Sequence, residues 1–280
     1  MFVALRALVV HGANALSCPL LVGYPTLTAY HGYACTTVRR LAQELGADLQ
    51  LKGLVIVHHG GQLRAHGQHR NRLTQKRYVH DAYPPPDADR RDYYFSPSGS
   101  PMPELDLTAS LLVQIEAPFP IGPALSRLER EAVDFVIGPK AFGGTVQSHG
   151  GLHAAGTLEE ALRLLPAGHL LGDRSSELMH PERDPLDCLF DLLRDRAAPY
   201  RRLAPVQVGW RGVTPLVERE TPRGRAAHAF AEPLIGLAEF IRVSTAAAAD
   251  RQAALWHPRI HRDANLFLLE TNAHGPDTSA

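Results

Sequence analysis

Small polar residues and prolines follow the first apolar strand at the point where a helix is expected to begin. Residues 14–19 read Asn-Ala-Leu-Ser-Cys-Pro, and residues 23–25 read Gly-Tyr-Pro. The N-terminus of a helix leaves backbone N–H groups unpaired and carries a partial positive charge, so such a corner suits a phosphate or a nucleotide. Asn14 and Ser17 could contact that ligand. They could equally serve as a turn residue and a helix cap.

A cationic segment lies between residues 60 and 103, where aliphatic residues become scarce. Its cations are Arg64, Arg70, Arg72, Lys76, Arg77, Arg90 and Arg91. They are interspersed with Asn71, Gln75 and the tyrosines Tyr78, Tyr83, Tyr93 and Tyr94. Cations that neutralise phosphates, combined with rings on which bases stack, are typical of single-stranded RNA binding. A solvated arginine-rich loop is the alternative.

A second group of cations surrounds Thr221 and Pro222. Arg219, Arg223 and Arg225 flank this dipeptide within seven residues of chain. They could form a solvated turn or a hairpin that contacts phosphates, and the sequence does not separate these two interpretations.

Histidines are frequent near the second strand, where His58, His59, His66 and His69 lie close together. No H-E-x-x-H motif occurs, and no cysteine joins them, so a zinc site is not the favoured interpretation. One of these histidines beside Tyr78 could instead act as a general acid or base. That arrangement would make the chain a metal-independent endoribonuclease, and a metal-dependent hydrolase is a third hypothesis.

Common catalytic motifs are absent from the sequence. It contains no phosphate-binding P-loop, no dinucleotide-binding glycine motif and no nucleophile elbow. Asp87 and Asp89 resemble a nuclease carboxylate pair only superficially, because they lie in a proline-rich loop. We therefore expect a protein that is not an enzyme and that needs no cofactor and no metal ion.

The elements that must position these residues alternate between strands and helices. Apolar patterns predict a strand over 2–10, a helix over 26–45 that ends at Gly46, and a strand over 51–58. The clearest alternation in the chain predicts a strand over 105–115, followed by a helix from Pro123 and a strand over 142–146. The order β-α-β-β-α-β is that of an RRM-like or ferredoxin-like sheet. Both helices then cover one face, and the other face stays open.

The fold class that we expect is α+β, with an RRM/ferredoxin-like core over residues 1–150 and a long basic insertion at about 60–103. Residues 151–280 should form a helical appendage, followed by C-terminal β-hairpin elements that pack back on the core. Thr157 with Glu160 forms a capping box, and Asp184-Pro185 begins a helix through Arg194. Strands are expected over 206–210, over 229–243 with breaks at Pro233 and Gly236, and over 265–269.

Composition limits the class of protein further. The chain has 280 residues, 45% of them hydrophobic, which is enough for a large core. Lys+Arg and Asp+Glu both total 29, so RNA contacts must come from local clustering of charge. Three cysteines without C-x-x-C spacing indicate a reducing compartment. No apolar run approaches the roughly 20 residues of a membrane span, so we expect a soluble, cytoplasmic protein.

Several segments together resemble the CRISPR type I-F Csy family, specifically its Cas-five-like second subunit. At the N-terminal end these are residues 14–19 and 23–25. At the C-terminal end they are Arg-Glu-Thr-Pro at 219–222 and Phe-Ala-Glu-Pro-Leu-Ile-Gly-Leu-Ala-Glu-Phe at 230–240. The chain departs from the family at Cys18, where a serine is usual, and at Ala238 and Phe240, where glycine and tryptophan are usual. It is also shorter than a typical member.

The resemblance implies a non-catalytic RNA-binding subunit of a surveillance complex. Such a subunit holds the 5′ handle of the CRISPR RNA, pairs with the large subunit as a heterodimer, contacts the adjacent backbone subunit, and lies near the flanking motif of target DNA. By position, Asn14 and Ser17 match the N-terminal motif, Lys76 and Arg77 match its Lys-Arg pair, and Arg219 and Thr221 match the Arg-Glu-Thr-Pro segment.

Overall fold

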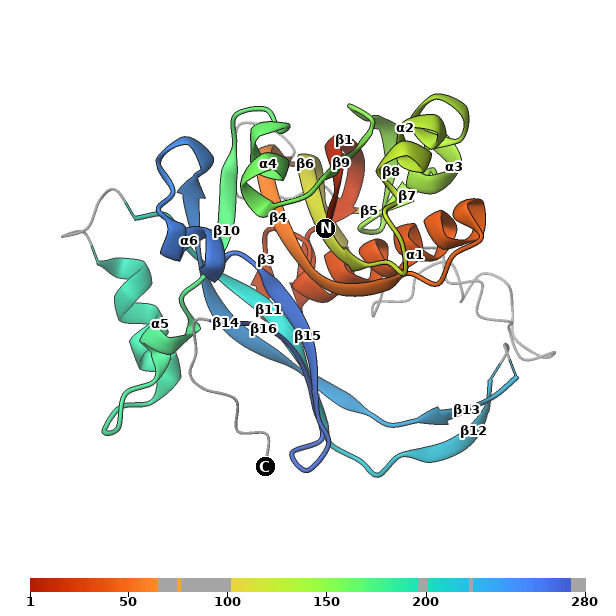
Figure 1. Cartoon of the computed structure of the whole chain (residues 1–280). Helices are drawn as coiled ribbons and strands as arrows, with labels where there is room; N and C mark the ends of the chain where they lie inside the picture. The colour runs from red at the N-terminus through yellow and green to blue at the C-terminus, as the bar shows by residue number, and fades with distance from the viewer. Residues whose placement is uncertain (65–74, 77–101, 196–200, 222–223, 273–280) are drawn as a thin grey trace.

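The computed structural model describes residues 1–64, 75–76, 102–195, 201–221 and 224–272 (Figure 1). The strands are β1 (Phe2–Asn14), β2 (Leu16–Cys18), β3 (Leu21–Val22), β4 (Gln50–Leu63), β5 (Gln75–Lys76), β6 (Met102–Glu116), β7 (Lys140–Ala141), β8 (Gly144–Ser148), β9 (Leu152–Ala155), β10 (His169–Asp173), β11 (Leu203–Gly212), β12 (Val217–Thr221), β13 (Gly224–His228), β14 (Ala231–Arg242), β15 (Trp256–His261) and β16 (Leu266–Thr271). The helices are α1 (Leu27–Leu45), α2 (Gly122–Glu131), α3 (Val133–Ile137), α4 (Leu158–Arg163), α5 (Pro185–Arg194) and α6 (Ala248–Ala253), with the short 3-10 helices η1 (Ser175–Leu178) and η2 (Val243–Thr245).

Most strands belong to one large antiparallel sheet, which confirms the predicted α+β class. Four of them lie in the order β4-β6-β1-β8, and each neighbouring pair is antiparallel. β9 pairs with the start of β1, and β10 pairs with β4. The portions on either side of residue 150 therefore share a single hydrogen-bonded sheet.

The main core lies between this sheet and the helices α1, α2 and α3. The alternation predicted for residues 105–115 is confirmed, because its six odd-numbered apolar side chains all join this core. The same core takes up the apolar stripe of α1. Thr26 caps the start of α1, and the left-handed Gly46 ends it, as the sequence predicts.

The second face of the sheet is also covered, so the prediction of an open face is wrong. Phe2, Val55 and Leu112 point away from α1 and pack into a second core. Ala161 and Leu162 of α4 join them there, together with residues from β10 and from around α6. Leu112 was the one apolar side chain on the polar face of its strand, which is the signal in the sequence for this second core. Segments after residue 150 supply the cover.

The C-terminal strands close into a ring against β4. Hydrogen-bonded pairs run from β10 through β14, β11, β16 and β15 to β4, and β4 also pairs with β10. Trp256 is fully buried in this part of the molecule, and its indole N–H donates to the carbonyl oxygen of Leu171 at 2.9 Å. The ring binds the C-terminal third to the central sheet.

β14 runs without a break through Pro233 and Gly236, which corrects the prediction of a broken strand. Proline is tolerated at 233 because β10 pairs with β14 only over 238–242, so the missing N–H faces no partner strand there. A Cβ at Gly236 would lie 2.5 Å from the hydroxyl oxygen of Ser175. Glycine thus allows the close approach of η1.

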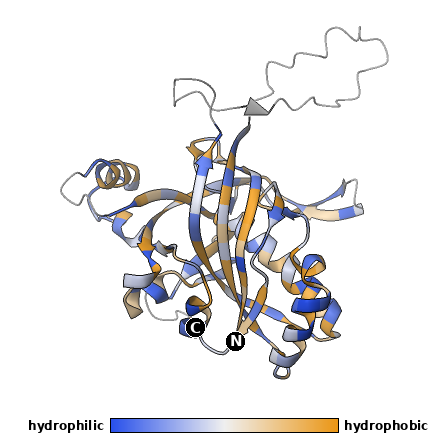
Figure 2. Ribbon diagram, turned by 90° about the horizontal axis from the view of Figure 1, so that it is seen from above, coloured by the Kyte–Doolittle hydropathy of each residue, from blue (hydrophilic) through white to orange (hydrophobic). Residues whose placement is uncertain are grey.

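Two elements extend away from the body of the molecule. Figure 1 shows α5 on one side and the β12–β13 hairpin on the other. Figure 2 shows the apolar residues concentrated in the strands of the central sheet. Among the described residues, no helix is both long and apolar enough to cross a membrane.

Candidate nucleic-acid interface

The corner after β1 is a compact turn whose polar groups bond to one another. Asn14 Oδ1 accepts a hydrogen bond from the backbone N–H of Leu16 at 2.9 Å. The Ser17 hydroxyl donates to the carbonyl oxygen of Tyr24 at 2.5 Å. Both side chains therefore stabilise the turn, as one structural alternative predicted. The helix-cap alternative is wrong, because Thr26 caps α1. Contact of either side chain with RNA stays a prediction.

The first turn of α1 is more enclosed than the sequence suggested. Thr26 Oγ1 accepts from the N–H of Ala29 at 2.9 Å. The Thr28 hydroxyl donates at 3.0 Å to Oε1 of Gln207, a fully buried side chain of β11. The Thr26 side chain thus accepts from one of the otherwise unpaired N–H groups of the helix N-terminus. Because β11 also packs beside this turn, less of the turn is open to a phosphate.

An aromatic stack joins the corner to two distant strands. The Tyr24 ring is stacked on the His58 imidazole of β4, with ring centroids 4.4 Å apart. The same Tyr24 ring lies 5.0 Å from the ring of Phe240 on β14. A Cβ at Gly61 would lie 3.2 Å from Tyr24, so this glycine lets the ring settle on β4. Tyr24 remains half-buried, which leaves part of its ring accessible.

His58 is held neutral beneath this stack. Its Nε2 lies 2.9 Å from the hydroxyl oxygen of Tyr30, and both side chains are buried. Burial, with smaller contributions from His59 and His169, lowers the pKa of His58 to about 3. An imidazole with this pKa does not exchange protons near neutrality, so His58 is unsuited to general acid or base catalysis.

His59 points to the other face and crosslinks three elements. Its Nδ1 lies 2.9 Å from the carbonyl oxygen of Ala167, and its Nε2 lies 2.6 Å from Oγ of the buried Ser110. The N–H of Ala7 donates to the same Oγ at 2.8 Å. Both ring nitrogens are thus occupied. No group of three His, Cys, Asp or Glu side chains in the described part of the chain could hold a metal ion.

Arg64 stands where the basic insertion leaves β4, and carboxylates neutralise its charge. Its guanidinium lies 2.7 Å from Oε2 of Glu104 and 2.7 Å from Oδ1 of Asp106, both on β6. Its backbone N–H donates to the carbonyl oxygen of Glu104 at 2.9 Å. Hydrogen bonding to Arg64 lowers the pKa of Asp106. Arg64 therefore clamps the two ends of the insertion together, and its contact with RNA stays a prediction.

Most other cations predicted for the insertion lie outside the described residues. These are Arg70, Arg72, Arg77, Arg90 and Arg91, as are the histidines His66 and His69 and the tyrosine Tyr78. Lys76 belongs to β5, whose backbone pairs with β6 through Lys76 and Met102. Residues 75–76 of the insertion therefore pair with the start of β6, the strand that follows the insertion in the chain.

The second cationic group lies on the β12–β13 hairpin. Arg219 pairs with Ala226 across the hairpin, and Arg225 pairs with Glu220. Because side chains alternate along a strand, Arg219 and Arg225 lie on opposite faces. The Arg219 guanidinium carbon lies 5.6 Å from the centroid of the Phe230 ring. The backbone of Thr221 pairs with Gly224; Arg223 lies outside the described residues.

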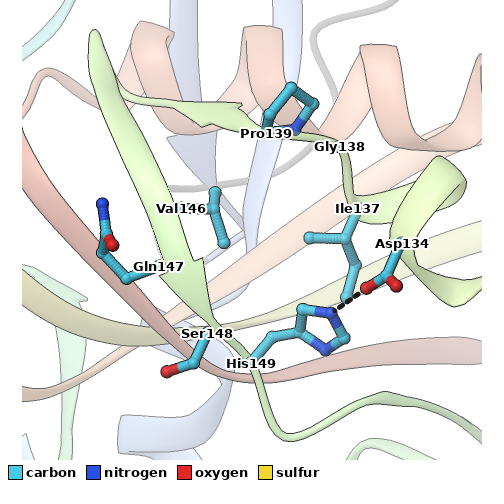
Figure 3. A pocket seen from close by; sticks show the side chains of 8 residues that line it. All are labelled: Asp134, Ile137, Gly138, Pro139, Val146, Gln147, Ser148 and His149. Atoms are coloured by element: carbon cyan, nitrogen blue, oxygen red, sulfur yellow. Dashed lines mark hydrogen bonds and ion pairs between the residues drawn. The ribbon is translucent and has the colours of Figure 1, made fainter.

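A pocket of about 470 Å³ lies between α3 and β8, at the edge of the sheet (Figure 3). His149 Nε2 donates to Oδ1 of Asp134 at 2.8 Å, and its Nδ1 accepts from the N–H of Gly151 at 3.2 Å. The Ser148 side chain points away from this imidazole (Figure 3). The pocket therefore offers no paired nucleophile and base.

The structure brings together residues that the sequence treated separately. Tyr24 belongs to the motif at 23–25 and Phe240 to the motif at 230–240, and the sequence assigns neither ring a partner. Their contact places the N-terminal motif against the C-terminal one. An aromatic residue between Gly23 and Pro25 was the available signal, because glycine and proline mark a turn and connecting segments run over the protein surface. No short sequence pattern predicts that β14, which carries Phe240, lies beside Tyr24.

Comparison with known proteins identifies one family. The model of the Cas_Csy2 family, described as a CRISPR-associated protein, matches residues 3–201, which is more than two thirds of the chain. The match covers the corner, both strands that carry the insertion, and the pocket. The β12–β13 hairpin and Phe240 lie beyond it. A search of curated proteins finds no match.

Proposed function

The chain belongs to the Cas_Csy2 family of CRISPR-associated proteins and is thus a subunit of a type I-F Csy complex; from this premise we propose that it is its non-catalytic RNA-binding subunit. It holds the 5′ handle of the CRISPR RNA and pairs with the large subunit for recognition of target DNA. The complex works in the cytoplasm.

The observation that carries the proposal is the position of the Tyr24 ring. It lies on β4 at Gly61, beside Leu105 of β6, and these two strands carry the basic insertion. A partly accessible ring next to a cationic segment is the combination that single-stranded RNA binding requires. The insertion supplies the cations, and the corner supplies the ring.

We assign the ferredoxin-like, RRM-like core to β1, β4, β6 and β8. Their antiparallel order β4-β6-β1-β8 supports this assignment, as does the position of α1 between β1 and β4 and of α2 between β6 and β8. Because the second face of the sheet is covered, bases do not spread over that face. RNA instead follows the corner, the insertion and the hairpin.

A non-catalytic role is supported by the state of the two described histidines of the cluster. His58 is neutral and buried, and both nitrogens of His59 are bonded. The endoribonuclease hypothesis then depends on His66, His69 and Tyr78.

Two exposed apolar surfaces support the proposal of protein partners. On α5, the side chains of Leu186, Phe190 and Leu193 follow a spacing of four and three residues, which places them on one side of the helix. Around the hairpin, Leu216 and Phe230 are exposed. Exposed apolar patches mark protein interaction sites. The large subunit and the backbone subunit would cover them.

Co-purification tests this proposal. The tagged chain is produced with the proteins encoded beside it and with a repeat array, and the bound nucleic acid is sequenced. We expect companion subunits and an RNA with one fixed 5′ end. Material that carries neither RNA nor companions would refute the proposal. Cleavage of repeat RNA by the purified chain, abolished by His66→Ala or His69→Ala, would favour the endoribonuclease.

A further inference from the structure

Arg202, His169 and Arg242 meet at one end of the ring of C-terminal strands. His169 of β10 pairs with Arg242 of β14, and the carbonyl oxygen of Arg202 accepts from the N–H of Phe240 at 2.9 Å. Side chains two residues apart on a strand share a face, so Arg242 lies on the face of Phe240, and Arg202 stands opposite Phe240 on that face. His169 also pairs with His58 of β4.

Arg202 and Arg242 lack the carboxylate partners that the neighbouring arginines Arg174 and Arg201 have, among the residues that the structure describes. On the opposite face, Arg174 and Arg201 bind Glu239 at 2.7 Å and 3.2 Å. Within the described residues, neither Arg202 nor Arg242 forms an ion pair with a carboxylate, and both are exposed. The two arginines are thus free to bind an external anion.

His169 provides a second, independent indication of a ligand. Its Nε2 is buried and has no hydrogen-bond partner in the part of the chain that the structure describes. Burial, and then the charges of Arg202 and Arg242, lower the pKa of His169. The pairing of His169 with Arg242 places these two side chains next to each other on adjacent strands. A buried polar atom without a partner is costly unless a ligand or water binds it.

The aromatic stack borders this cationic group. Phe240 lies two residues before Arg242 on the same face of β14, 5.0 Å from the ring of Tyr24 and 5.5 Å from that of His58. A phosphate bound by the arginines would bring its nucleoside within reach of these rings.

We infer that Arg202, Arg242 and His169 form a phosphodiester-binding subsite that holds one phosphate of single-stranded RNA while the adjoining base stacks on Tyr24. This inference rests on the proposed function and adds a subsite to it. Each nucleotide of RNA carries one phosphate anion and one flat base. This surface offers arginines for the phosphate beside aromatic rings for the base. An acidic peptide offers the anions without the rings.

A salt titration of the full chain tests the phosphate contacts. The probe is a fluorescently labelled octauridylate, and the variant is R202Q/R242Q. Each phosphate neutralised on a single strand contributes about 0.7 to the slope of log affinity against log salt, and the two arginines share one phosphate, so we expect the slope to fall by about 0.7. The affinity should fall by about eightfold at 0.05 M salt and converge with that of the wild type near 1 M.

The matched control is R211Q/R259Q, which removes two exposed arginines of β11 and β15 that form no ion pair among the described residues. Its slope should equal that of the wild type. Equal slopes for both double variants would overturn the subsite while leaving RNA binding intact. A wild-type chain that binds no RNA, alone or with its companion subunits, would refute the proposed function as well.

Substitution of Tyr24 tests the stacking. Removal of a stacked base contact costs about 5- to 150-fold in affinity, so Y24L should lower the affinity by that factor at every salt concentration without changing the slope. Y24F keeps the ring and should bind as the wild type does. Loss of binding in Y24F, or octaglutamate that competes as well as octauridylate, would contradict the assignment to a nucleotide.

Discussion

At the residue scale, His58 shows how burial removes a histidine from acid-base chemistry. Its Nδ1 has no hydrogen-bond partner among the described residues, and its Nε2 is bonded to Tyr30. The folded state keeps the ring neutral down to a pH of about 3. The unfolded chain takes up a proton near the ordinary pKa of about 6.5.

This difference predicts a loss of stability in mild acid. Because the unfolded state alone binds the proton, the contribution of His58 is fully present above about pH 6.5 and is lost as the pH falls toward 3. The loss is about 1.4 kcal/mol per pH unit at most. In H58F this part of the pH dependence should disappear, at a cost of about 1–3 kcal/mol for the unpaired Tyr30 hydroxyl. Urea unfolding between pH 7 and pH 4.5 measures both, and an unchanged pH dependence in H58F would contradict the assignment.

The ion pair of Arg64 with Asp106 gives the same sign of pH dependence as His58, but at lower pH. Hydrogen bonding to Arg64 holds the pKa of Asp106 below the usual range. The resulting stability is present above about pH 4 and is lost as the pH falls through the lowered pKa of the folded state. R64Q should lower the free energy of unfolding by about 1 kcal/mol at pH 7, because the pair is partly exposed. The difference between the variant and the wild type should shrink as the pH falls below 4, which thermal unfolding at pH 7 and at pH 2.5 can measure.

At the element scale, local signals correctly predicted helix ends in α1, α4 and α5. Thr26, Gly46, the Thr157–Glu160 capping box and Asp184 fix helix ends as the sequence predicts. Each of these caps forms between residues at most four positions apart, so its formation does not depend on how distant segments pack. The continuity of β14 through Pro233 was not predictable, since it depends on where the neighbouring strand β10 stops.

The close contact of β11 with β16 predicts a sensitive glycine. A Cβ at Gly209 would collide with the carbonyl oxygen of Phe267, a backbone atom that cannot move aside alone. G209A should therefore lower the free energy of unfolding by about 2 kcal/mol or more. G60A is the matched control, because a Cβ at this strand glycine meets nothing within 4 Å. Its effect should stay within about 0.5 kcal/mol. Equal effects of the two substitutions in urea unfolding would contradict the packing described for Gly209.

At the scale of the whole molecule, the β12–β13 hairpin extends the surface of the protein but contributes no side chain to the hydrophobic core among its described residues. Its described side chains are exposed on both faces. A two-stranded ribbon without a packed face is marginal on its own, so we expect a partner or RNA to stabilise it in the proposed complex.

Removal of the hairpin separates its stability role from its function. Val213 pairs with Phe230 at its base, where the N–H of Val213 donates to the carbonyl oxygen of Phe230 at 2.9 Å. Replacement of residues 214–229 by Asn-Gly should close the strands with a two-residue turn. The free energy of unfolding should change by less than about 1 kcal/mol, while affinity for the CRISPR RNA or companion subunits falls. Full affinity in the shortened chain would exclude the hairpin from both interfaces.

The sequence by itself determined the α+β class, the alternation that builds the face of β6, the helix ends and the family, because these depend on residue types read over short stretches. The tertiary structure alone decided that both faces of the sheet are covered and that carboxylates neutralise Arg64. It also decided that Tyr24 meets Phe240, more than two hundred residues away, and that Arg202 and Arg242 share a face. The physical reason is strand register: a shift of one residue turns every side chain to the opposite face, and the pairing that fixes it involves strands distant in the chain.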